Sequence, residues 1–246
     1  MKQQIILTSK LEKVQAEVER EKERSILLRS ISHDLRSPLT GIAGSSNFLA
    51  DNYDTISKED AVALLHDMEN DAQSLTRMVE NLLNMTRIQD GRLIIQKKNE
   101  VLDDLISESV SRVVKKDSTQ KVTIDSTSEI LIVPVDSRLI IQVFSNLIDN
   151  AIKYTPENST IKIKTVLSSN KKDAIITVSD NGNGIPQGME EKIFDTFTTG
   201  ISKGDRGRGL GLGLSICRTI IKAHGGTISE TNSKEGGAVF TIILPL

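Results

Sequence analysis

Hydrophobic residues recur every three or four positions from near the N-terminus, which is the spacing of one face of a helix. The first such series is Leu7, Leu11, Val14, Val18, Glu21, Ser25 and Leu28. Alternating steps of four and three residues are the heptad pattern of a coiled coil, and the polar members predict a weak dimeric one. A single solvent-exposed helix is the alternative interpretation of this stretch.

The helical pattern continues in two further series, separated by polar residues at 51–57. The earlier series is Leu28, Ile31, Leu35, Leu39 and Ile42. The later series is Ala61, Leu65, Met68, Ala72, Leu75, Val79, Leu82 and Thr86. Pro38 predicts a kink in the first helix, and Ser57 with Asp60 predicts the N-cap of the second. One antiparallel pair has too little partner surface for both apolar faces, so two copies are expected to form a four-helix bundle.

After Asp90-Gly91 the pattern changes to short runs rich in β-branched residues. These runs lie at 93–95, 121–124, 130–133, 161–166, 174–178, 226–229 and 239–244. Helical patterns alternate with them at 102–114, 137–154 and 212–224. The alternation predicts a two-layer α/β sandwich with helices on one face of a sheet. Residues 186–209 are too long for an ordinary connection and are expected to form a mobile lid.

Composition narrows the classes of protein that fit this pattern. Only 3% of the 246 residues are aromatic, so the core must be mostly aliphatic. The chain has 31 Lys and Arg against 33 Asp and Glu, which leaves no whole-chain basic field for nucleic acid. Cys217 is the single cysteine and excludes an internal disulfide or a cysteine-based zinc cluster. No apolar run approaches the ~20 residues of a membrane span, so a soluble chain is expected.

His33 is the first candidate for chemistry. At about 100° per residue it falls on the opposite side of its helix from the hydrophobic stripe. Asp34 follows it directly, and a neutral imidazole beside a carboxylate is a competent nucleophile or base. An idle surface histidine is the alternative. His66 and His224 lack such neighbours and are interpreted as structural.

Two polar constellations follow in the second half of the chain. Asn146, Asn150 and Lys153 recur on one helical face, which suits a hard cation such as Mg²⁺ and the charge of phosphates. A purely solvated polar face is the alternative. Asp180 ends a strand before two glycines, at 182 and 184, where a carboxylate can accept a hydrogen bond from an exocyclic amine. A plain turn is the alternative there.

A glycine-rich run leads into the last predicted helix. It contains Gly209, Gly211 and Gly213, and free backbone amides at a helix N-terminus favour phosphate. Lys203, Arg206 and Arg208 add positive charge in the adjoining lid. The spacing matches neither a dinucleotide-binding fingerprint nor a P-loop.

In this order, the motifs resemble those of the sensor histidine kinases of two-component signalling. Residues 32–39 resemble the H box, 146–154 the N box, 180–186 the G1 box, 193–197 the F box and 209–215 the G2 box. The resemblance covers about 25–246, including the C-terminal segment that begins at Gly236-Gly237. The heptad pattern predicts a coiled-coil or signalling helix at 1–25, and the resemblance implies a dimerisation and phosphoacceptor hairpin at 26–91. It also implies, at 92–246, a catalytic domain of the ATPase fold shared with gyrase, Hsp90 and MutL.

The resemblance also implies a role for individual residues, with ATP and Mg²⁺ as cofactors. His33 would accept the γ-phosphoryl group, Asp34 would orient or deprotonate its ring, and an aspartate of a response-regulator receiver domain would take the group next. Asn150 would bind Mg²⁺ with Asn146 beside it. Lys153 would contact phosphate, Tyr154 would pack near adenine, and Asp180 would bond the adenine amine. The remaining nucleotide contacts would be Gly182, Gly184, Ile185, Phe197, Lys203, Arg206, Arg208, Gly209, Leu210, Gly211, Leu212 and Gly213.

Some positions depart from the usual family pattern. Ser37 stands where many relatives have Thr or Asn, and its retained hydroxyl keeps phosphatase activity towards the regulator open. Thr198-Thr199-Gly200 replaces a common aromatic and basic pair, so lid contacts are expected to differ. The chain is expected to be a homodimer and the cytoplasmic portion of a receptor anchored in the membrane by segments outside it. The other function classes are an ATPase or serine kinase without a phosphohistidine, and a nucleotide-binding scaffold.

Overall fold

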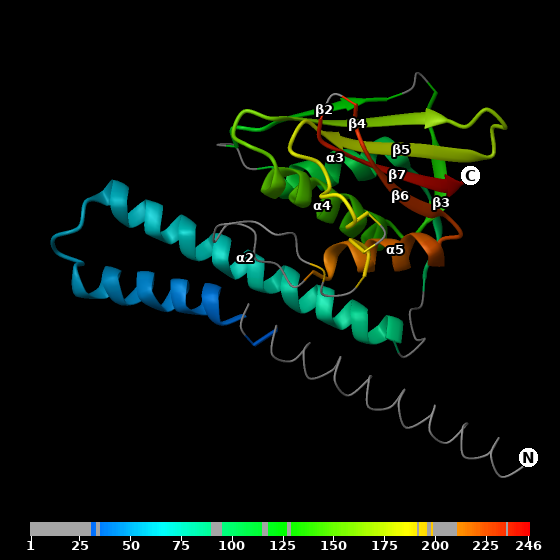
Figure 1. Cartoon of the computed structure of the whole chain (residues 1–246). Coiled ribbons are helices and arrows are strands. Elements are labelled where there is room, and N and C mark those ends of the chain that lie inside the picture. The colour runs from blue at the N-terminus through cyan, green and yellow to red at the C-terminus, as the bar shows by residue number, and fades with distance from the viewer. Residues whose placement is uncertain are drawn as a thin grey trace, which may run out of the picture. The chain divides into compact units, whose positions relative to one another are not determined.

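The computed structural model describes residues 31–32, 35–89, 95–114, 118–126, 129–190, 192–195, 198, 211–234 and 236–246 (Figure 1). Contacts within the chain divide it into two compact units, Met1–Glu80 and Asn81–Leu246. Across these ranges, no helix is both long enough and apolar enough to cross a membrane.

Two helices joined by a short turn build the described part of the first unit. The earlier helix covers residues 35–51 and contains Pro38, and α2 covers Lys58–Gln89. Ser57 caps α2 as predicted, because its Oγ accepts the Asp60 N–H at 3.0 Å and donates to Asp60 Oδ2 at 2.7 Å. The predicted helical hairpin is therefore confirmed.

The two helices do not bury the whole of each predicted hydrophobic series. The half-buried positions of the earlier helix are Leu35, Pro38, Ile42, Ser45 and Leu49. Those of α2 include Ala61, Leu64, Met68, Asp71, Leu75 and Met78. Leu39 and Leu65, both 55% exposed, belong to the predicted series but not to these faces. Each helix thus carries a half-buried face and, beside it, an exposed row of apolar residues. The repeat in the sequence contains members of both and does not distinguish them.

Beyond the end of α2, the described residues of the second unit form ten helices and strands. They are β1 (Lys98–Val101), α3 (Leu102–Val113), β2 (Lys121–Asp125), β3 (Ile132–Val135), α4 (Ser137–Tyr154), β4 (Thr160–Leu167), β5 (Asp173–Asp180), α5 (Gly213–Ala223), β6 (Thr227–Asn232) and β7 (Ala238–Pro245). Five strands form one sheet in the order β2-β4-β5-β7-β6, in which β2 and β4 are parallel and the other pairs are antiparallel. β1 and β3 form a separate antiparallel pair.

The helices α3, α4 and α5 lie on one side of the five-stranded sheet, as Figure 1 shows. Every second residue of the central strands points to them, and Ile163, Ile176 and Ile242 are fully buried. α4 supplies Phe144, the largest fully buried side chain among the described residues. The core is mostly aliphatic, and the two-layer α/β sandwich predicted from the sequence is confirmed.

The first strand of the sandwich differs from the prediction. Of the predicted 93–95, only Ile95 is described, and it has no regular structure. The observed β1 is Lys-Asn-Glu-Val, a polar sequence with low strand propensity. β1 pairs with β3 and leads directly into α3. In a sheet of two strands each strand is an edge strand, and edge strands tolerate polar side chains.

Candidate functional site

α4 carries the first group of predicted site residues along one face. Asn146 and Asn150 are half-buried, whereas Leu147, Ile148 and Ala151 on the other face are buried in the core. Asn146 Nδ2 donates to Gly213 O at 3.4 Å and to Cys217 Sγ at 3.8 Å, both on α5. Asn146 Oδ1 and the whole Asn150 side-chain amide have no hydrogen-bond partner among the described residues. Two such amide oxygens suit a hard cation, so this face fits Mg²⁺.

The end of α4 carries the predicted phosphate and adenine contacts. Lys153 Nζ lies 2.6 Å from Asp149 Oδ2, and both side chains are partly exposed. Exposed ion pairs contribute little, so the lysine can exchange this partner for a phosphate at small cost. Tyr154 is 42% exposed, which leaves its ring available to a ligand.

Asp180 is the last residue of β5, and the two oxygens of its carboxylate differ in their hydrogen bonds. Its Oδ1 accepts the N–H of Gly182 at 2.9 Å and of Ala238 at 3.1 Å. Its Oδ2 has no hydrogen-bond partner in the part of the chain that the structure describes. One oxygen therefore fixes the side chain, and the other remains an acceptor for a ligand.

The loop after Asp180 packs against the end of α4. A Cβ at Gly182 would lie 2.9 Å from Thr155 Cγ2 and 3.1 Å from Tyr154 O, so glycine allows this close approach. The structure thus brings Asp180 and Tyr154, predicted as separate motifs, to one location. Ile185, also predicted as a site residue, is buried.

Two residues of this region were not predicted from the sequence to belong to the site. Asn232 at the end of β6 bonds the main chain of Ile185, and Gly237 lies against Asp180, where an added Cβ would collide with the Asp180 carbonyl oxygen. The Gly236-Gly237 turn was the available signal for the second. Asn232 had none, because its partner is 47 residues away in sequence.

The start of α5 faces Asn146. Gly211 has φ +61°, Leu212 is buried, and a Cβ on Gly213 would lie 3.8 Å from Asn146 Cγ. No side chain caps this helix, and its first intrahelical bond runs from Ile216 N to Leu212 O. The preceding amides, with no partner in the described ranges, carry the positive end of the helix dipole. This end of α5 suits an anionic group beside the amide face of α4.

Two titratable groups near the site are structural. Burial raises the pKa of the Cys217 thiol to about 12, and its Sγ donates to Val143 O at 3.7 Å. His224 is buried between α5 and Asp136, whose N–H donates to Nε2 at 3.0 Å. Its Nδ1 lies 2.8 Å from Ile220 O, so the neutral ring with hydrogen on Nδ1 satisfies both contacts. The interpretation of His224 as structural is confirmed.

Part of the predicted site lies outside the described residues. These positions are His33, Asp34, Phe197, Lys203, Arg206, Arg208, Gly209 and Leu210, together with most of the predicted lid. Ser37 is described and is exposed on the helix at 35–51. Within the described ranges, no cluster of three or more His, Cys, Asp or Glu could hold a metal ion. A cation there would depend on amide oxygens and on ligand phosphates.

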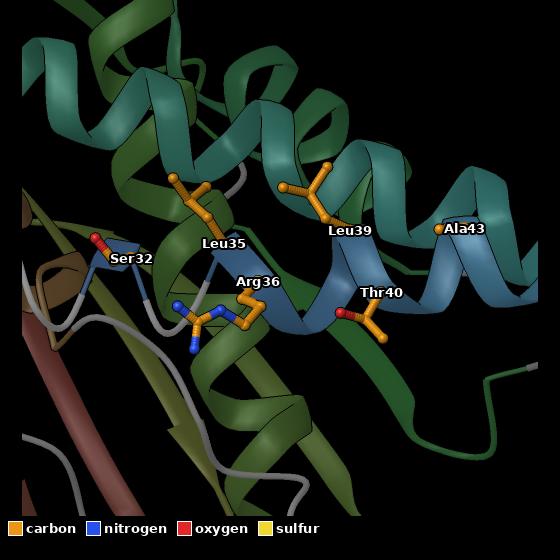
Figure 2. A pocket seen from close by; sticks show the side chains of 6 residues that line it. All are labelled: Ser32, Leu35, Arg36, Leu39, Thr40 and Ala43. Carbon is orange, nitrogen blue, oxygen red and sulfur yellow. The ribbon is translucent and has the colours of Figure 1, made fainter.

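A shallow groove lies on the helix that follows His33 (Figure 2). One side is an apolar row of Leu35, Leu39 and Ala43, and the other is Ser32, Arg36 and Thr40. Each row repeats every four residues, so both run along the helix. Figure 2 shows Leu35 and Leu39 extending to the side where α2 lies.

Two family models match the chain. The model of histidine kinase-, DNA gyrase B- and HSP90-like ATPases matches residues 135–246. The model of the His Kinase A phospho-acceptor domain matches residues 23–91.

Similar curated proteins are sensor proteins. KdpD of Clostridium acetobutylicum is 42% identical over 241 residues, which are 98% of this chain and 27% of that protein. KdpD of Escherichia coli is 34% identical over 244 residues, which are 99% of this chain and 27% of that protein. The chain thus spans about a quarter of the length of these relatives.

Similar solved structures are kinases. The catalytic domain of histidine kinase ThkA is 35% identical, with a TM-score of 0.54, and the match covers 61% of this chain and 97% of that one. ThkA in complex with response regulator protein TrrA is 28% identical, with a TM-score of 0.60, over 95% of this chain and 66% of that one. Histidine kinase AdeS of Acinetobacter baumannii is 25% identical, with a TM-score of 0.62, over 87% and 97%.

Proposed function

Because the chain belongs to the histidine kinase family, we propose that it phosphorylates His33 from ATP and passes the phosphoryl group to an aspartate of a response regulator. The observation that carries this proposal is that the two oxygens of the Asp180 carboxylate differ in their hydrogen bonds. Its Oδ1 is used by the Gly182 and Ala238 amides, while Oδ2 has no hydrogen-bond partner among the described residues. That oxygen is suited to accept a hydrogen bond from the exocyclic amine of adenine.

The phosphates of ATP would lie between α4 and the start of α5. The N-terminal amides of α5 and Lys153 would receive their negative charge. When bound, Mg²⁺ would neutralise part of that charge, and Asn150 with Asn146 would hold it. Gly182, Gly184, Ile185, Gly211, Leu212 and Gly213 would shape the pocket, and Phe197, Lys203, Arg206, Arg208, Gly209 and Leu210 would complete it from the lid.

In the first transfer, a neutral imidazole nitrogen of His33 attacks the γ-phosphorus, and the bond to the β,γ-bridging oxygen breaks. ADP leaves with that electron pair, and Asp34 holds or accepts the proton of the other ring nitrogen. In the second transfer, a carboxylate oxygen of the regulator attacks the same phosphorus and the imidazole leaves. The ThkA structure contains a response regulator, which supports a partner of this class. The protein contributes mainly position and charge.

We extend the proposal to the assembly and its location. The exposed row on α2, which includes Leu65 and Val79, suits a second copy of the hairpin in a four-helix bundle. The proposed domains are residues 1–25, 26–91 and 92–246, acting as the cytoplasmic portion of a membrane-anchored sensor. Ser37 is exposed, so its hydroxyl is accessible for orienting water against a phosphorylated regulator.

The test is labelling of the purified chain with Mg²⁺ and ATP that carries a radioactive γ-phosphate. We expect one phosphate per chain that is stable to base and labile to acid. His33→Ala is expected to lose it. His66→Ala is the matched control, because His66 is an exposed histidine of α2 paired with Glu69 at 3.6 Å, and this variant should label fully. Full labelling of His33→Ala, or ATP turnover without a phosphoenzyme, would contradict the proposal.

A further inference from the structure

The side chain of Asn232 binds both main-chain groups of Ile185. Ile185 N donates to Asn232 Oδ1 at 2.7 Å, and Asn232 Nδ2 donates to Ile185 O at 2.9 Å. An amide offers one acceptor and two donor hydrogens in a plane, so it can pair with a peptide unit as a neighbouring strand would. Because Ile185 is buried, Asn232 replaces the water that these groups would otherwise bind.

Gly184, the residue before Ile185, lies against the side chain of Asn232. Its φ is +71°, and a Cβ there would lie 2.6 Å from Asn232 Oδ1. The positive φ favours glycine here, and a larger residue would have to displace the Asn232 amide. The predicted Gly184 is thus explained by a partner that lies on another strand.

The other end of the same loop is attached to the same hairpin. Ala238 N donates to Asp180 Oδ1 at 3.1 Å, and Gly237 packs against the Asp180 main chain. Asn232 and Ala238 are opposite each other in the β6–β7 ladder. One end of one hairpin therefore holds the loop at Asp180 and again at Ile185.

We infer that Asn232 is a positioning residue of the nucleotide site, which fixes the Gly184–Ile185 main chain and with it the width of the pocket beside Asp180. The inference rests on the proposed function, since it assumes that Asp180 receives the adenine. Asn232 acts through Ile185 and Gly184, so it governs affinity for the base and takes no part in phosphoryl transfer.

The experiment compares Asn232→Ala with the wild-type chain in ATP binding and autophosphorylation. We expect the Kd and KM for ATP to rise about tenfold, as the loss of one to two net hydrogen bonds implies. The rate at saturating ATP should stay within about twofold, and the preference for ATP over GTP should fall with the affinity. Asn232→Asp keeps the acceptor for Ile185 N and loses the donor, so an intermediate Kd is expected.

Asn170→Ala is the matched control for a merely structural effect. Asn170 lies in the β4–β5 turn, where its Oδ1 accepts from Lys172 N at 2.9 Å and Ser168 Oγ at 2.6 Å. This variant should leave the KM for ATP unchanged. The inference is overturned if Asn232→Ala binds ATP like the wild type, or if it lowers only the saturated rate.

Asp180→Asn separates this inference from the proposed function. If this variant binds ATP as the wild type does, the assignment of the adenine site fails, and the role of Asn232 fails with it. If Asp180→Asn loses ATP while Asn232→Ala keeps wild-type affinity and selectivity, the site stands and the role of Asn232 alone fails. Loss in both variants, with Asn170→Ala unchanged, supports both.

Discussion

Thr165 places a hydroxyl in the aliphatic core. It is buried on β4, and its Oγ1 has no hydrogen-bond partner within the described ranges. Thr165→Val keeps the shape and removes the unpaired hydroxyl, so we expect the free energy of unfolding to rise by about 1 kcal/mol. Urea unfolding measures this change. Thr177→Val, on the outer face of β5, is the control and should gain less. A less stable Thr165→Val would show that the hydroxyl is satisfied in the folded protein.

His224 makes stability depend on pH. Burial lowers its pKa below the usual 6.5 and Lys97 adds to this, while the Ile220 carbonyl and Asp136 act in the opposite direction. Arg138 also lies near, 3.7 Å from Asp136 Oδ1. As the pH falls below about 6.5, His224 is protonated more readily in the unfolded chain than in the folded one, so the free energy of unfolding falls.

His224→Gln cannot titrate at this position, so its stability should change less between pH 7.5 and 5.5 than that of the wild type. Urea unfolding at about pH 7.5, 6.5 and 5.5 gives the comparison. Gln73→Ala changes an exposed residue that does not titrate and should keep the wild-type slope. An unchanged slope in His224→Gln would contradict the role of the buried ring.

At the scale of elements, Gly237 directly precedes β7 and packs against the end of β5. Its φ is +88°, and that of Gly188 is +81°, so alanine is strained at both positions by about 1 kcal/mol. At Gly188 an added Cβ meets open space, whereas at Gly237 it collides with the Asp180 carbonyl oxygen. Gly237→Ala should therefore lose far more stability than Gly188→Ala.

Thermal unfolding of the two variants, with and without ATP, tests this difference. We expect Gly188→Ala to keep stabilisation by ATP and Gly237→Ala to lose it, because the collision displaces Asp180. Equal melting temperatures would show that the hairpin moves away without cost, and that it does not hold the loop.

Most elements were predictable from periodicity, and the exceptions have physical reasons. α4 covers the predicted 137–154, because its buried and polar faces alternate without interruption. β1 was not predicted, because its residues Lys98, Asn99 and Glu100 are polar and have low strand propensity. The hairpin helices carry two apolar rows each, and a repeat of four and three residues does not say which row faces the partner helix.

The arrangement of the site was less predictable than its components. Asn146 and Gly213 are neighbours because α4 and α5 pack side by side, and Gly182 reaches Thr155 because β5 ends beside α4. The strand order β2-β4-β5-β7-β6 places β7 between β5 and β6. Local sequence patterns carry no information on such pairings, and this is why Asn232 was not identified.

At the scale of the whole molecule, the exposed apolar row of α2 predicts the oligomeric state. Leu65 and Val79, 55% and 47% exposed, lie fourteen residues apart on one face, where water is a poor neighbour. We expect the chain to be a homodimer at micromolar concentration in sedimentation. The double substitution of Leu65→Lys with Val79→Lys should yield monomers, because two lysines from each copy would meet in the interface.

The same variant separates assembly from nucleotide binding. The residues proposed to bind ATP belong to the second unit, so the monomeric variant should keep the wild-type Kd for ATP. Gln73→Lys adds a charge to an exposed polar position of α2 and should remain dimeric. A wild-type monomer, or a dimer in the double variant, would refute an interface through this row. A monomer that no longer binds ATP would instead show that the nucleotide site depends on the dimer.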